Sequence, residues 1–124
     1  MDRKIEEQNQ HITLRVGDDY TEAIGRAIRF DIPPGMPDLA GATASMTLTP
    51  LLVDRNAYTV AGTIITDAPS PRILYSVGRD ITSNLITGDP AYEYVARVTL
   101  LDGSVITRGA GVVRVLSGGA GATP

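Results

Sequence analysis

Residues 92–107 read YEYVARVTLLDGSVIT, and this stretch decides the fold class. Its apolar residues recur at every second position, which is the period of a β-strand with one buried face. They are Tyr92, Tyr94, Ala96, Val98 and Leu100. Asp102-Gly103 then fits a two-residue type I′ turn, because both central positions need positive φ and Asp and Gly tolerate it best. The stretch therefore predicts a β-hairpin whose second strand begins near Val105.

A two-residue loop also fixes the pairing of the two strands. It places Leu100 opposite Val105 and Ala96 opposite Gly109 on the inner face, with Tyr94 covering Gly111 further out. On the outer face it would set Arg97 opposite Arg108. Like charges in that position cost roughly a few tenths of a kcal/mol, so these two arginines are candidates for meeting an acidic partner, with simple solvation as the alternative.

A bulge is the alternative to this uniform register. If residues 109–111 hold one, every pairing beyond it shifts by one residue.

The same alternation extends over most of the chain. Apolar residues recur at spacing two around residues 28–32, 44–48, 58–64 and 73–77. Turn-forming residues separate these runs at intervals of roughly 10 to 20, a pattern typical of a β-sandwich or barrel. The proline-rich loops at 33–37 and 67–71 lack amide donors, so we expect them at crossovers or edges. A helix over 21–28 is the one competing interpretation, with Ile24 and Ile28 four residues apart behind a possible Thr21 cap.

Composition places the chain in one domain. It has 124 residues, 43% of them hydrophobic, and a net charge of −3 with no basic run, which argues against nucleic acid as a main partner. The polar start and the lack of a long apolar run predict no membrane contact and no signal peptide. We expect a polar N-terminal arm at 1–11, the β-domain at 12–116 and a flexible Gly/Ser/Ala tail at 117–124.

Few residues offer chemistry. His11 is the single histidine, so it cannot build a two-histidine metal site, and an idle or structural role is expected. Asp18 and Asp19 with Asp89 could hold a hard cation, although a solvated loop that caps backbone amides is favoured. The tyrosines mostly fall on inward faces, which favours core packing over a binding platform. We therefore predict no catalytic residue, no cofactor and no metal.

Several short motifs nevertheless resemble a known family. Asp38-Leu39-Ala40-Gly41-Ala42 leads into an alternating strand, and Pro90-Ala91-Tyr92-Glu93-Tyr94 begins the penultimate one. Together with the Asp102-Gly103 tip, they resemble the immunoglobulin-like N-terminal domain of bacteriophage baseplate upper proteins and related tail-fibre proteins. The likeness extends over residues 12–116, although the family's usual threonine is Ala40 here.

The resemblance implies both a fold and a role. The fold would be an all-β, immunoglobulin-like antiparallel sandwich of about seven or eight strands, with Tyr92 as a tyrosine corner that ties a loop to its strand. The role would be that of a non-enzymatic virion protein in a tail, baseplate, fibre or capsid position. It would be assembled in the host cytoplasm and docked to other virion proteins. A carbohydrate- or host-receptor-binding module is the alternative.

The last strand predicts how such a protein would assemble. Residues 111–116 are apolar on both faces, with Arg114 as their one charge. Since a sandwich core can cover only one face, we expect Val112 and Val115 to meet a second copy or another virion protein. The sequence therefore predicts an oligomer with this strand at the contact.

Overall fold

The computed structural model describes residues 7–52, 55–67 and 70–118. Within them lie seven strands, which are β1 (Ile12–Arg15), β2 (Ile28–Asp31), β3 (Thr43–Pro50), β4 (Tyr58–Ile65), β5 (Arg72–Tyr75), β6 (Gly88–Thr99) and β7 (Val105–Leu116). Two short helices join them, the 3-10 turn η1 (Glu22–Ile24) and the single turn α1 (Arg79–Thr82). The predicted all-β class is confirmed.

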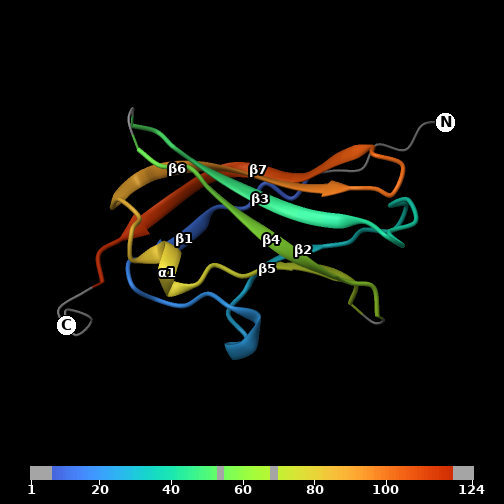
Figure 1. Cartoon of the computed structure of the whole chain (residues 1–124), viewed down its shortest axis with the longest axis horizontal. Helices are drawn as coiled ribbons and strands as arrows, with labels where there is room; N and C mark the ends of the chain where they lie inside the picture. The colour runs from blue at the N-terminus through green and yellow to red at the C-terminus, as the bar shows by residue number, and fades with distance from the viewer. Residues whose placement is uncertain (1–6, 53–54, 68–69, 119–124) are drawn as a thin grey trace.

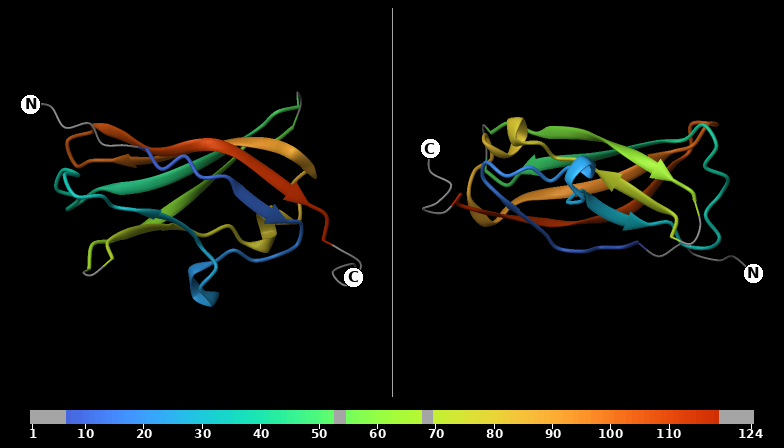
Figure 2. Two further views of the ribbon diagram at one scale, coloured as in Figure 1. Left: turned by 180° about the vertical axis from the view of Figure 1, so that it is seen from behind. Right: turned by 90° about the horizontal axis from the view of Figure 1, so that it is seen from below.

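All seven strands belong to one continuous sheet in the order β1-β7-β6-β3-β4-β5-β2. Neighbouring strands are antiparallel except for β1 and β7, which run parallel. The sheet curls until its edge strands β1 and β2 approach each other, which produces a barrel that is almost closed (Figures 1 and 2). A sandwich of two purely antiparallel sheets is thus not what these pairings form.

The core occupies the inside of this barrel, on the face that the alternation predicts. The largest fully buried side chains include three tyrosines, Tyr75, Tyr92 and Tyr94, together with Phe30. The Phe30 ring packs edge-on against Tyr75, with 5.7 Å between ring centroids. Such aromatic pairs add roughly 1 kcal/mol beyond the area that they bury.

The gap between the two edges of the sheet is closed by side chains from the N-terminal segment. Gln10 Nε2 donates to the Arg29 carbonyl at 2.9 Å, and the Asp31 amide donates to Gln8 Oε1 at 2.9 Å. The backbone amide of Gln8 in turn donates to the Arg108 carbonyl of β7 at 2.8 Å. Residues 8–10 are therefore fixed between β7 and β2. The predicted polar N-terminal arm is thus bound to the barrel at residues 8–10, while residues 1–6 lie outside the described part.

Glycine makes this close approach possible. A Cβ atom at Gly109 would lie 2.3 Å from the Gln8 carbonyl oxygen and 2.6 Å from Phe30 Cε2. Real Cβ atoms do not come so close to backbone, so no other residue fits here without moving the N-terminal segment.

The β6–β7 hairpin has a different register from the predicted one near its tip. Leu100 pairs with Ser104 rather than Val105, because the loop holds three residues and Gly103 takes φ +91° at its end. Arg97 consequently faces Thr107. Beyond that point Ala96 faces Gly109 and Tyr94 faces Gly111, as predicted.

A β-bulge at Arg108 changes the register between the tip and the rest of the hairpin. Arg108 is the extra residue on β7, between Thr107, which faces Arg97, and Gly109, which faces Ala96. The sequence placed a possible bulge at 109–111, one residue too late. The predicted Arg97–Arg108 pair is therefore wrong.

The connections follow the prolines. Residues 33–37 lie in the passage from β2 to β3, which are not neighbours in the sheet, so this loop is the predicted crossover. Residues 67–71 join the neighbours β4 and β5, and residues 68–69 lie outside the described part. Of the alternative helix over 21–28, only the short 3-10 turn η1 forms, and Gly25 caps its C-terminus. Ile28 is instead the first residue of β2.

Candidate functional site

The two arginines of the predicted acidic-partner contact are in unlike places. Arg97 is exposed on β6, whereas Arg108 is only 3% exposed and its Nε donates to the Asp31 carbonyl at 2.8 Å. The bulge turns Arg108 inward, where burial lowers the pKa of its guanidinium and the charge of Asp31 opposes that shift. Arg108 thus helps to close the barrel between β7 and β2.

Tyr92 lies in the core and its hydroxyl reaches a loop. The Ile86 amide donates to Tyr92 Oη at 3.1 Å, and the side chain is 1% exposed. The bond joins β6 to the segment that precedes it, six residues upstream.

Burial also affects two other core tyrosines. It raises the pKa of Tyr94 to about 12, and it raises the pKa of Tyr75 as well. The Tyr94 hydroxyl donates to the Gln10 carbonyl, which fastens the N-terminal segment from inside.

The predicted contact strand is an interior strand of the sheet. Residues 113–116 of β7 pair with β1 on one side, and β6 lies on the other. Val115 is 2% exposed in the core, and Val112 is half-buried on the outer face. The expectation that Val115 meets a partner is therefore wrong, because its side chain packs in the core, and β1 covers the side of residues 113–116 that β6 does not.

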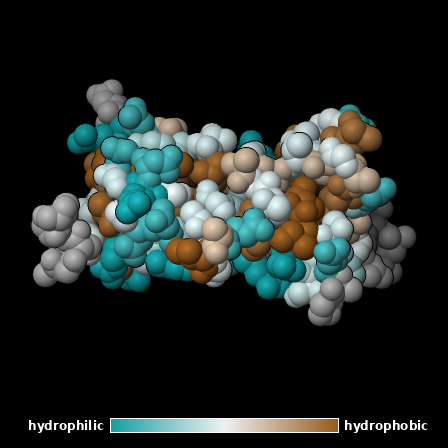
Figure 3. Space-filling view, turned by 60° about the horizontal axis from the view of Figure 1, so that its bottom comes forward, coloured by the Kyte–Doolittle hydropathy of each residue, from teal (hydrophilic) through white to brown (hydrophobic). Residues whose placement is uncertain are grey.

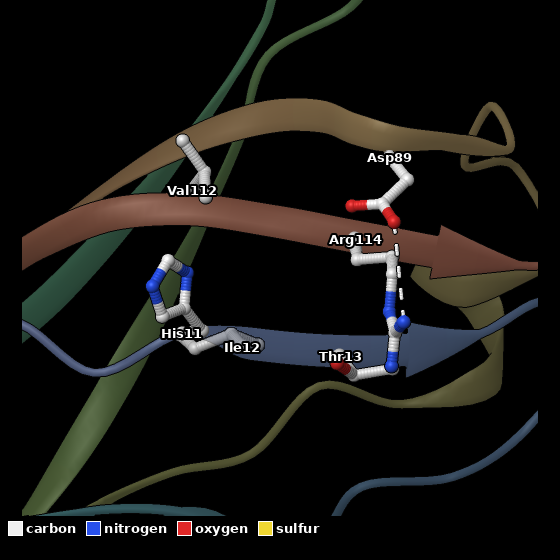
Figure 4. Close-up of a pocket in the computed structure, with 6 residues that line it drawn as sticks. All are labelled: His11, Ile12, Thr13, Asp89, Val112 and Arg114. Atoms are coloured by element: carbon white, nitrogen blue, oxygen red, sulfur yellow. Dashed lines mark ion pairs between the residues drawn. The ribbon is translucent and has the colours of Figure 1, made fainter.

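That same pairing builds a hollow on the outside of the barrel. Ile12 and Val113 face each other and point inward, so the outward side chains Thr13 and Arg114 are partners and His11 lies beside Val112. Asp89, near the start of β6, completes the lining of a hollow of about 210 Å³ (Figure 4). We call it the β1–β7 hollow; it is lined by His11, Ile12, Thr13, Asp89, Val112 and Arg114.

The β1–β7 hollow holds one positive and one negative side chain, Arg114 and Asp89, which form a long ion pair. Arg114 Nη1 lies 3.9 Å from Asp89 Oδ2, and both side chains are well exposed, at 47% and 71%. At that distance the contact is an ion pair without a hydrogen bond. The site therefore offers a cationic donor group, an acceptor carboxylate, an imidazole and a hydroxyl around the half-buried Val112.

Sequence reasoning found His11 and Asp89 but placed them apart. The alternation shows that His11 and Thr13 share a face, as do Val112 and Arg114, yet nothing in it shows that the first and last strands pair. The other two aspartates proposed as cation ligands make contacts within the protein. Asp19 Oδ1 accepts a hydrogen bond from the Arg79 backbone amide at 2.8 Å, and Asp18 forms an ion pair with Arg26 at 3.5 Å. Within residues 7–52, 55–67 and 70–118, no cluster of three or more His, Cys, Asp or Glu could hold a metal ion.

Two other hollows lie at the ends of the barrel. One, of about 500 Å³, is mostly apolar and lies in the β2–β3 crossover, between Pro33, Pro34, Met36, Pro37 and Pro71. The other, of about 150 Å³, is polar and is lined by Arg55, Asn56, Tyr58, Asn84, Ile86 and Tyr92.

Comparison of the chain with known protein families, with curated proteins and with solved structures finds no match. In the described part of the chain, neither helix has the length and apolar character required to cross a bilayer.

Proposed function

We propose that this protein is a non-catalytic bacteriophage virion protein, an assembly and docking module of a tail, baseplate, fibre or capsid. The observation that carries the proposal is the apolar end of the barrel. At the tip of the β6–β7 hairpin Leu101 is 80% exposed and Val105 57% exposed. Large apolar side chains left in water at one place are typical of surfaces that meet another protein.

The loops around that tip extend the apolar surface. Leu101 packs over Gly41 of the crossover, whose proline-lined groove opens at the same end of the molecule. In the space-filling view apolar surface lies toward this end (Figure 3), and Leu51 and Leu52, which follow β3 at the opposite end, are also exposed, at 43% and 59%. A partner would therefore dock end-on, through loops that the barrel holds in place.

The proposal includes kinship with immunoglobulin-like domains. It is supported by the motifs of residues 38–42 and 90–94, and by the bond from the Ile86 amide to Tyr92 on the penultimate strand. A tyrosine corner makes a comparable bond to backbone a few residues upstream.

Two measurements test the assembly role. Mass spectrometry of virions purified from the phage that encodes the chain should find its peptides in constant stoichiometry. Light scattering at micromolar concentration should show an oligomer that Leu101→Glu with Val105→Glu dissociates, while Thr59→Glu, at an exposed position of β4, leaves it intact. A strict monomer that is also absent from virions contradicts the proposal.

A carbohydrate- or receptor-binding module is the second candidate, and one observation favours it. Tyr58 is partly exposed and lines the polar hollow with Asn56 and Asn84. An aromatic ring beside amide groups suits a sugar, which presents both C–H faces and hydroxyls. Saturable glycan binding that Tyr58→Ala abolishes would select this role over the first.

A further inference from the structure

We infer that the β1–β7 hollow binds a small carboxylate that also carries hydroxyl groups, a sugar acid such as glucuronate. This inference goes beyond the assembly role and does not depend on it. It concerns the outer wall of the barrel, away from the apolar hairpin tip.

The carboxylate would bind Arg114. A guanidinium presents five N–H donors in a planar fork that matches both oxygens of a carboxylate. Among the described residues, the one polar contact of Arg114 is the ion pair with Asp89, whose 3.9 Å length leaves those donors to solvent. Such a fork can accept a ligand without first breaking a hydrogen bond within the protein.

Thr13 would assist Arg114. The parallel register makes the two residues partners across β1 and β7. In Figure 4 the Arg114 side chain runs from β7 toward β1 and ends close to Thr13. The threonine hydroxyl can therefore donate to the same carboxylate that the guanidinium binds.

Asp89 decides what else the ligand must carry. Its carboxylate repels a simple anion on Arg114, and it can accept hydrogen bonds from a ligand that brings donors. A hydroxy acid meets both demands, since its carboxylate faces Arg114 while its hydroxyls face Asp89. This combination disfavours acetate, which has no hydroxyl, and glucose, which has no charge.

The rest of the lining limits the size and shape of the ligand. The half-buried Val112 is the apolar side chain of the outer face here, and His11 lies on the β1 side of the hollow (Figure 4), while the Ile12 side chain points into the core. Its volume of about 210 Å³ is below the roughly 300–1,000 Å³ of sites for drug-sized ligands. One sugar ring laid against the valine therefore suits the hollow better than a larger molecule.

The test is a ¹H–¹⁵N NMR titration of the full chain with glucuronate, glucose and acetate at equal ionic strength. We expect saturable, fast-exchange shifts at Thr13, Asp89 and Arg114 with glucuronate, and no shift at the same glucose concentration. Acetate should bind at least several-fold more weakly than glucuronate.

Variants separate this site from general charge attraction. Arg114→Gln should weaken glucuronate binding tenfold or more, while Arg97→Gln, which removes another exposed arginine from the neighbouring strand β6, should leave it unchanged. Asp89→Asn should bring acetate and glucuronate closer in affinity. Shifts that do not saturate, glucose binding equal to glucuronate, or equal losses from Arg97→Gln and Arg114→Gln would each overturn the inference.

Discussion

The Tyr92 hydroxyl is a small group with a measurable role, because it is the acceptor for the Ile86 amide at 3.1 Å. Tyr92→Phe keeps the ring and removes that acceptor, so we expect a loss of about 1 kcal/mol in the free energy of unfolding. Tyr92→Ala also empties the core and should cost about 3–5 kcal/mol. Urea denaturation measures the free energy of unfolding of both variants. Equal, negligible effects would show that the Ile86–Tyr92 hydrogen bond does not stabilise the fold.

Gly103 ends the hairpin loop at φ +91°, with nothing within 4 Å of where a Cβ would be. Space is therefore available but the backbone conformation is not, since a β-branched residue rarely takes positive φ. We expect Gly103→Val to cost about 1–3 kcal/mol and to lower the melting temperature. Leu101→Val in the same loop is the control and should change it little, whereas equal effects would mean that φ at residue 103 is not limiting.

At the scale of elements, the N-terminal segment replaces a missing strand pairing. Gln8 and Gln10 satisfy the free edge of β2 with side-chain amides, and an edge covered in this way does not recruit other chains. Replacing both by Ala should cost about 1 kcal/mol for each bonded side chain lost.

Amide hydrogen exchange should show the effect of that double variant more clearly at the edge of β2 than the overall free energy of unfolding does. The Asp31 amide should exchange with solvent much faster, because its acceptor is Gln8 Oε1. Amides between β3 and β6 serve as the internal control and should keep their protection. Uniform acceleration across both regions would indicate global destabilisation instead.

Some elements could be predicted from the sequence because their cause is local. The alternation from Tyr92 to Leu100 identifies a strand and its buried face by itself, and Asp102-Gly103 marks the turn. Arg108 could not be placed, since one residue of difference in loop length decides whether it faces water or the core. The pairing of β1 with β7 could not be predicted either, because it joins residues about a hundred positions apart and no turn sequence connects the two strands. The β1–β7 hollow depends on that pairing, so its residues could be named individually but not brought together.

For the molecule as a whole, we expect the buried tyrosines to limit stability at alkaline pH. The pKa of Tyr94 is raised from 10.0 to about 12, so the folded state disfavours the phenolate relative to the unfolded chain. This contribution is fully present below pH 10 and is lost as the pH rises from about 10 through 12. The raised pKa of Tyr75 acts in the same direction.

Urea midpoints measured between pH 8 and pH 12 test this limit. We expect the midpoint to be flat up to about pH 10 and to fall beyond it. Tyr94→Phe should be less stable at pH 8, because it loses the bond to the Gln10 carbonyl, and it should show a shallower alkaline decline. A wild-type midpoint that stays constant to pH 12 would contradict the prediction.

The parallel pair β1–β7 has a mechanical consequence. Because the two strands run in the same direction, the chain enters the barrel near one rim and leaves it near the other (Figure 1). Tension applied between residues 12 and 116 pulls β1 and β7 past each other along their length. Their hydrogen bonds are then loaded in shear and must rupture together, whereas strands pulled apart from one end unzip bond by bond. Placed between two anchored neighbours, the domain would act as a stiff link whose load passes through the four residue pairs that join β1 to β7.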